Sequence, residues 1–153
     1  MKKLFILLIL GLVSVVLFSC NQSDGNNTNT DLYIGHINIE GDILNLDEVE
    51  WITDENQNRI KELGLSQLDM PNGYYINNPS TDTVSFKIAE DTEYNFVALE
   101  SLSFYKEGED RNYSTTKKEE FMEFLNNVRT DRVVFSVEVK DGFVVSIKEQ
   151  YTN

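Results

Sequence analysis

The chain begins with a sharp change from apolar to polar positions. An unbroken apolar run covers residues 4–18, follows Lys2 and Lys3, and leads into Ser19-Cys20. The run has 15 residues, fewer than the roughly 20 that a membrane-spanning helix needs. A basic start, an apolar stretch and a small residue before the cut are typical of an export signal. Because a cysteine stands at the cut, we predict a lipoprotein signal peptide at residues 1–19 and lipidation of Cys20.

A polar tract separates this signal from the rest of the chain. Residues 21–30 consist of Asn, Thr, Ser, Asp, Gln and Gly, a composition that cannot bury enough apolar surface to become ordered. We therefore expect residues 20–31 to be the lipidated cysteine followed by a flexible tether. The remaining residues, 32–153, are sufficient for one core and predict a single β-rich globular domain.

Alternating positions after the tether predict a β-hairpin. Ile37 and Ile39 fall on one face of a strand, and the alternation resumes with Leu44 and Leu46 after Gly41-Asp42. A two-residue turn places Ile39 opposite Leu44 and Ile37 opposite Leu46, which makes one face of the hairpin wholly apolar.

A second hairpin is predicted at the end of the chain. A two-residue turn at residues 141–142 would mix apolar and polar side chains on both faces, whereas a three-residue loop at 140–142, with Gly142 in the left-handed conformation, makes one face apolar. The sequence therefore favours the three-residue loop. This register pairs Val139 with Phe143, Val137 with Val145 and Phe135 with Ile147.

Two helices are predicted from their caps and apolar stripes. Asp54 with Gln57 three residues later begins the first, which Gly64 ends. Thr116 with Glu119 forms a capping box for the second, over residues 117–128. The apolar stripe of the second helix consists of Phe121, Phe124, Leu125 and Val128.

The stretch between the helices contributes further strands. A turn at Pro71-Asn72-Gly73 precedes short strands at 73–77, 84–88 and 94–99, and residues 106–112 are expected to be a charged loop. The element order predicts an α+β, mainly β fold: a small, strongly bent antiparallel sheet or a partly open OB-like barrel with two covering helices.

Several segments of the domain resemble a known group of proteins. Residues 47–53 contain Glu-Trp-Ile-Thr, residues 70–77 contain Pro-Asn-Gly-Tyr-Tyr-Ile-Asn, and residues 142–151 end in Glu-Gln-Tyr. With Arg59 and residues 62–65, these segments resemble small secreted or lipid-anchored proteins of Gram-positive bacteria that have no assigned activity. The resemblance implies a location and a fold, and it implies no catalytic residue.

The net charge of the chain limits the classes of partner that it is expected to bind. Loss of Lys2 and Lys3 with the signal lowers the basic count from 13 to 11 against 26 acidic residues, so the mature net charge is −15. Such a charge argues against nucleic acid, whose phosphates need Lys and Arg, and against broad contact with anionic lipid. Cys20 is the single cysteine, so no disulfide within the chain can stabilise the fold.

Candidates for catalysis or metal binding are weak in the sequence. His36, the single histidine, lies on the polar face of the first strand without a second His or Cys to complete a zinc site. Neighbouring carboxylates recur near residues 47–50, 54–55 and 107–110. A glycosidase needs two carboxyls roughly 5–10 Å apart in one cleft, and nothing in the sequence selects a pair. We expect no catalytic residue, no metal and no cofactor.

Three aromatic residues form a candidate binding surface. Trp51, Tyr74 and Tyr75 lie in the segments that carry the resemblance. Alternation places Tyr74 and Tyr75 on opposite faces of a strand, so one of them could lie beside Trp51 as a platform for a sugar or a peptide. A core position is the expectation for Trp51, through a bend in the strand after the acidic residues 47–50.

These observations favour a lipoprotein at the outer face of the cell membrane. We expect a non-enzymatic binding or accessory role at the bacterial cell envelope, with a membrane contact through the lipid on Cys20 and with an envelope ligand or an exported protein as partner. Two alternatives remain: an envelope hydrolase that uses a carboxylate pair, and an inhibitor or assembly partner of another exported protein.

Cys20→Ser tests the predicted anchor. Because an oxygen in place of the thiol blocks lipid transfer, the variant should be left unprocessed or be shed into the medium. Cell fractionation and an immunoblot of the intact chain check this outcome. A Cys20→Ser protein that is processed and kept in the membrane fraction like the unchanged protein would contradict the anchor.

Overall fold

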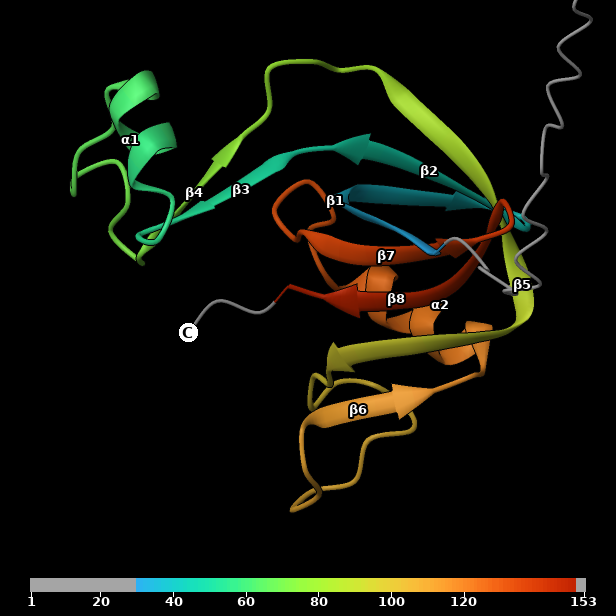
Figure 1. Cartoon of the computed structure of the whole chain (residues 1–153). Coiled ribbons are helices and arrows are strands. Elements are labelled where there is room, and N and C mark those ends of the chain that lie inside the picture. The colour runs from blue at the N-terminus through green and yellow to red at the C-terminus, as the bar shows by residue number, and fades with distance from the viewer. Residues whose placement is uncertain (1–29, 151–153) are drawn as a thin grey trace, which may run out of the picture.

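Five β-strands close into a barrel in the computed structural model, which describes residues 30–150 (Figure 1). The order around the barrel is β1-β2-β5-β8-β7, and pairing of β2 with β5 as well as β1 with β7 closes the ring. All neighbours are antiparallel except β5 and β8, which run parallel. The strands are β1 (Thr30–Glu40), β2 (Ile43–Glu48), β5 (Thr83–Val97), β7 (Phe135–Lys140) and β8 (Phe143–Glu149).

This topology confirms the predicted OB-like barrel. Along the chain, the first to fifth barrel strands are β1, β2, β5, β7 and β8. Helix α2 (Lys118–Asn127) lies between the third and the fourth of these strands. The predicted signal peptide, Cys20 and most of the predicted tether lie outside the described residues. Within residues 30–150, no helix combines the length and apolar character that crossing a membrane requires.

The first hairpin has the predicted register. Ile39 lies opposite Leu44 and Ile37 opposite Leu46, on either side of a two-residue turn at Gly41-Asp42. All four side chains are buried in the barrel. The alternation of apolar residues was sufficient here because each strand has one buried face and no irregularity.

Gly35 is the point at which β1 changes neighbours. Residues 30–35 of β1 pair with β7, residues 35–40 pair with β2, and Gly35 itself lies opposite both Phe135 and Glu48. A Cβ atom at this position would lie 2.3 Å from the backbone oxygen of Asp47. Only glycine therefore allows β1 to bend closely over β2 and to close the ring.

The predicted register of the terminal hairpin is wrong. The turn has two residues, Asp141 and Gly142, and Val139 lies opposite Val144 instead of Phe143. Both turn residues have positive φ, 53° and 83°, as a tight hairpin turn requires. A shift in the register then leaves Val145 as an extra residue, so that Val137 pairs with Ile147. This β-bulge restores the apolar face that the sequence argument had assigned to a longer loop.

Strand β5 is longer than predicted. The strands expected at 84–88 and 94–99 are one element with an irregularity between Ile88 and Glu93. The buried Thr92 spans this irregularity, with its hydroxyl 2.7 Å from the carbonyl oxygen of Val144 and 2.8 Å from that of Ala89. A strand that was not predicted, β6 (Asn112–Thr115), pairs antiparallel with the second half of β5.

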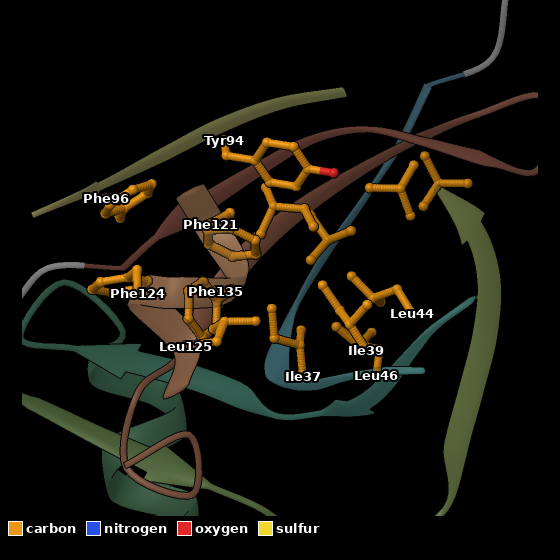
Figure 2. Close-up of a cluster of buried hydrophobic side chains, with 14 of the residues drawn as sticks. Ile37, Ile39, Leu44, Leu46, Tyr94, Phe96, Phe121, Phe124, Leu125 and Phe135 are labelled. Atoms are coloured by element: carbon orange, nitrogen blue, oxygen red, sulfur yellow. The ribbon is translucent and has the colours of Figure 1, made fainter. Parts of the chain in front are cut away.

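Helix α2 covers one end of the barrel. Its residues Phe121, Phe124 and Leu125 are buried as predicted, whereas Val128 is the C-cap residue. Phe124 stacks on Phe96 of β5, with their ring centroids 4.4 Å apart. Figure 2 shows these two rings at one side of a buried cluster whose other side consists of the aliphatic side chains of β1 and β2, so the helix completes the core.

The predicted cap of α2 is wrong. The helix has no side-chain cap at its N-terminus. Glu120, instead of Glu119, closes this end by accepting hydrogen bonds from Thr115 Oγ1 at 2.7 Å, from Lys117 Nζ at 2.8 Å and from the Tyr113 hydroxyl at 2.9 Å. The lysine bond, followed by the Thr115 and Tyr113 bonds, holds the pKa of Glu120 below its usual value.

A separate arm lies between the second and third barrel strands. It consists of β3 (Glu50–Thr53), α1 (Gln57–Leu63) and β4 (Tyr74–Asn77), and β3 pairs with β4. Figure 1 shows that the arm extends to one side of the barrel, opposite the turns of the two hairpins, with α1 at its far end. Helix α1 ends at Gly64, as predicted, but Asn56 is its N-cap residue and Asp54 is not.

Gly35→Ala tests the close approach of β1 and β2. Because the added methyl group would meet backbone instead of a flexible side chain, we expect a loss of about 1–3 kcal/mol in the free energy of unfolding. Gly142→Ala, which faces open space and suffers from its positive φ alone, should lose about 1 kcal/mol. Urea unfolding of both variants checks the order, and a Gly35→Ala protein as stable as wild type would contradict it.

Candidate functional site

A polar groove lies on the outer face of the first barrel strands. Its volume is about 600 Å³. The face is built by alternation, since the odd-numbered residues of β1 and the even-numbered residues of β2 point into the core. Loop 129–134, which leads into β7, forms one wall. The residues that line this groove are His36, Ile37, Asn38, Asn45, Asp47, Asn78, Thr83, Thr130 and Asp131.

Asp47 is the polar residue of this groove whose hydrogen bonds are incomplete. It lies in β2 between His36 of β1 and Thr83 of β5. Its Oδ2 accepts a hydrogen bond from Asn78 Nδ2 at 3.0 Å. Its Oδ1 is buried and, among residues 30–150, has no hydrogen-bond partner. A buried acceptor without a partner costs about 1–3 kcal/mol. Because this oxygen has almost no accessible surface, a ligand donor reaches it only when the Asp47 side chain turns toward the groove.

His36 presents a second acceptor to the groove. Its Nδ1 lies 2.9 Å from the carbonyl oxygen of Val133. Because a carbonyl oxygen accepts and cannot donate, Nδ1 carries the hydrogen, and Nε2 of the neutral ring is then an acceptor. The bond also holds loop 129–134 against β1. His36 therefore links the polar face of β1 to loop 129–134.

The other polar groups of the groove are amides, hydroxyls and one ion pair. Ser85 Oγ donates to Asn45 Oδ1 at 2.7 Å, which fixes this amide and leaves its NH₂ group as a donor. Asp131 pairs with Arg129 at 2.7 Å, and this guanidinium holds the pKa of the Asp131 carboxyl below its usual value. The groove thus offers an uncharged polar surface around two carboxylates, of which one is neutralised by arginine.

The groove lies in part on the face where OB-folds bind ligands, since Asn45 and Asp47 belong to the second barrel strand and Thr83 to the third. The face formed by the second and third strands of an OB-fold, with its first and last hairpin loops, binds oligonucleotides and oligosaccharides. Here both hairpin loops are two-residue turns and lie on the side opposite the arm (Figure 1). Binding at this face would therefore rely on the strands, on loop 129–134 and on the base of the arm.

The arm brings Trp51 and Tyr74 together, as the aromatic hypothesis required. Their rings stack with a centroid distance of 4.4 Å and an interplanar angle of 7°. Trp51 pairs with Ile76 across the arm, and these three residues share one face. With residues 132–134 and 149–150 this face encloses an aromatic pocket of about 180 Å³.

The expected core position of Trp51 is wrong. Its ring is half-buried, while the following residue, Ile52, is 1% exposed and takes the inner position. The expected break in the strand does occur: β2 ends at Glu48, β3 starts at Glu50, and Val49 between them is buried. The direction in which the Trp51 side chain points is therefore set by the pairing of β3 with β4 in the arm and not by the barrel.

Tyr75 does not join the pair. It lies opposite Ile52, on the other face of the arm from Trp51 and Tyr74. Of the three residues in the candidate surface, the structure therefore brings two together and separates the third. All three are half-buried.

A charged cluster fixes the arm next to the groove. Arg59 of α1 donates to both carboxylate oxygens of Glu50, at 2.7 and 3.0 Å, and Asn77 donates to Glu50 at 2.9 Å. These bonds, with arginine first, hold the pKa of Glu50 below its usual value. This arrangement gives Glu50 a structural role instead of the catalytic one considered for residues 47–50.

The other groups of carboxylates noted in the sequence lie on exposed segments. Asp54 and Glu55 are exposed beside α1, and residues 107–110 form an exposed loop, as expected. Glu149, at the edge of the aromatic pocket, accepts a bond from the Val97 amide at 2.7 Å, and burial raises the pKa of its carboxyl. Within residues 30–150 no three His, Cys, Asp or Glu side chains are grouped so that they could hold a metal ion.

Sequence reasoning missed the groove because its parts come from distant segments. The polar alternation of β1 and β2 indicated an exposed face. Neither the position of loop 129–134 nor the orphaned oxygen of Asp47 has a local signal. The comparisons add no assignment: no protein-family model, curated protein or solved structure matches the chain significantly.

Trp51→Ala measures how far the arm depends on its stacked pair. A half-buried ring with one aromatic neighbour should contribute less than a core ring, so we expect a loss of about 1–2 kcal/mol in the free energy of unfolding. Phe135→Ala, at a fully buried position, should lose about 3–5 kcal/mol. Urea unfolding followed by circular dichroism compares the two, and equal losses would show that Trp51 is a core residue.

Proposed function

We propose that this protein is a lipoprotein of the outer face of the cell membrane that binds a polar ligand of the cell envelope without transforming it. The predicted signal at residues 1–19 and the predicted lipid on Cys20 support the location. The barrel supports the binding role, because it presents a polar groove on the face that OB-folds use for ligands; this step is an analogy between folds.

The observation that carries the proposal is the buried Oδ1 of Asp47. Asp47 lines a groove of about 600 Å³, and this oxygen has no partner among the described residues, so a turn of the side chain places an unsatisfied acceptor in the groove. With Nε2 of His36 it gives the groove two acceptors to which no described residue donates, which suits a ligand rich in hydroxyl, amide or amine donors. The net charge of −15 after signal removal disfavours polyanions such as nucleic acid.

Binding is favoured over hydrolysis by the state of the carboxylates. A carboxyl that acts as general acid at neutral pH has a raised pKa. In the groove, Arg129 lowers the pKa of Asp131. The carboxyl of Glu149, whose pKa is raised by burial, accepts a hydrogen bond from the Val97 amide and lies outside the groove. Neither Asp131 nor Glu149 is therefore placed to act as a general acid in the groove.

Asp47→Asn tests this function, with Asp91→Asn as the matched control. Asp91 is also a strand aspartate, but it is exposed and belongs to the irregular part of β5 and not to the groove. The full-length proteins, purified in detergent, are sedimented with purified cell-wall sacculi. Because a hydrogen bond to a charged group contributes about 1.5–3 kcal/mol, Asp47→Asn should weaken binding about tenfold or more.

The control variant should bind like wild type. Circular dichroism and urea unfolding verify that both variants are folded. Failure of wild type to sediment with the sacculi, or equal binding by Asp47→Asn and wild type, would contradict the proposed function.

A further inference from the structure

The polar groove and the aromatic pocket share a wall. Thr130 and Asp131 of loop 129–134 line the groove, and the next residues of the same loop, Arg132 to Val134, line the aromatic pocket. The opposite side is continuous as well, since Asn78 lies in the groove and Ile76 in the pocket. The hydrogen bond from His36 to the carbonyl oxygen of Val133 joins the floor of the groove to this common wall.

The sequence spacing of Asp47 and Trp51 sets an upper limit to the distance that a ligand must span to reach both sites. Asp47 and Trp51 are four residues apart in one segment, which spans at most about 14 Å when extended. A short oligomer of sugars is long enough to contact both residues. The two sites therefore suit a chain molecule.

We propose that groove and pocket form one extended site for an uncharged oligosaccharide, with one sugar ring against the Trp51–Tyr74 pair and the next rings in the groove. This inference rests on the proposed function and adds the class of ligand. A flat aromatic pair offers an apolar surface to the C–H face of a sugar ring, while Arg132, Glu149 and Gln150 at the pocket edge offer partners for its hydroxyls.

The composition of the groove favours a glycan over a peptide. Peptide-binding surfaces read side chains with apolar pockets or aromatic-lined grooves. Of the nine residues that line this groove, Ile37 is the single aliphatic one, and it is 4% exposed. The remainder are amides, hydroxyls, a histidine and two carboxylates, which match the many hydroxyl and amide groups of an amino sugar polymer.

The single tryptophan makes the proposal directly measurable. Trp51 is the one tryptophan of the chain, so its emission reports occupancy of the aromatic pocket alone. The full-length protein in detergent is titrated with β-1,4-linked N-acetylglucosamine, from the monomer to the hexamer. Calorimetry measures the affinity, and the emission is recorded in parallel.

We expect the hexamer to bind more tightly than the dimer and to change the emission of Trp51. Tyr74→Ala should weaken hexamer binding roughly three- to tenfold, as expected for loss of an aromatic contact, and should leave dimer binding unchanged. Tyr75→Ala, on the other face of the arm, is the matched control and should bind both oligomers like wild type. Asp47→Asn should weaken binding of both.

Two outcomes would overturn the extended site and leave the proposed function intact. In the first, dimer and hexamer bind equally well and the emission of Trp51 does not change at saturation. In the second, the protein sediments with sacculi but binds none of the oligomers. A proline-rich peptide that changes the emission of Trp51 where the oligomers do not would likewise overturn the glycan assignment.

Discussion

Closure of the barrel depends on the contact between β1 and β2 at Gly35. Without a side chain, Gly35 lets β1 pair with β7 before the bend and with β2 after it. A methyl group at the same place would meet the carbonyl oxygen of Asp47. The residue that closes the core is thus adjacent to the residue that provides the binding acceptor. The bend also brings the outer faces of β1, β2 and β5 side by side, which creates the groove.

The stability of the buried core offsets the free-energy cost of the unpartnered Asp47 oxygen. A buried acceptor without a partner, as at Asp47 Oδ1, destabilises the folded state. The buried aromatic and aliphatic cluster around Phe121 and Phe135, shown in Figure 2, supplies stability without any disulfide. Strained or unsatisfied groups of this kind persist where the surrounding structure fixes them, and such places are commonly binding sites.

The sequence predicted local features well and long-range ones poorly. The alternation of apolar residues predicted the exact register of the first hairpin, because Ile39 and Leu44 flank a regular two-residue turn. The same argument failed at the terminal hairpin, since a bulge at Val145 preserves the apolar face in another register. It failed at Trp51 because pairing with β4 decides its facing. The groove depends on loop 129–134 meeting β1, a contact of distant segments that no local pattern encodes.

The base of the arm links the two parts of the site. The Asp47–Asn78 hydrogen bond joins the end of β2, just before the arm, to the residue that follows β4. The Arg59–Glu50–Asn77 contacts fix the next residues of the same two segments. Together these contacts hold the Trp51–Tyr74 pair beside the groove, at the position where the next unit of the proposed extended ligand would lie.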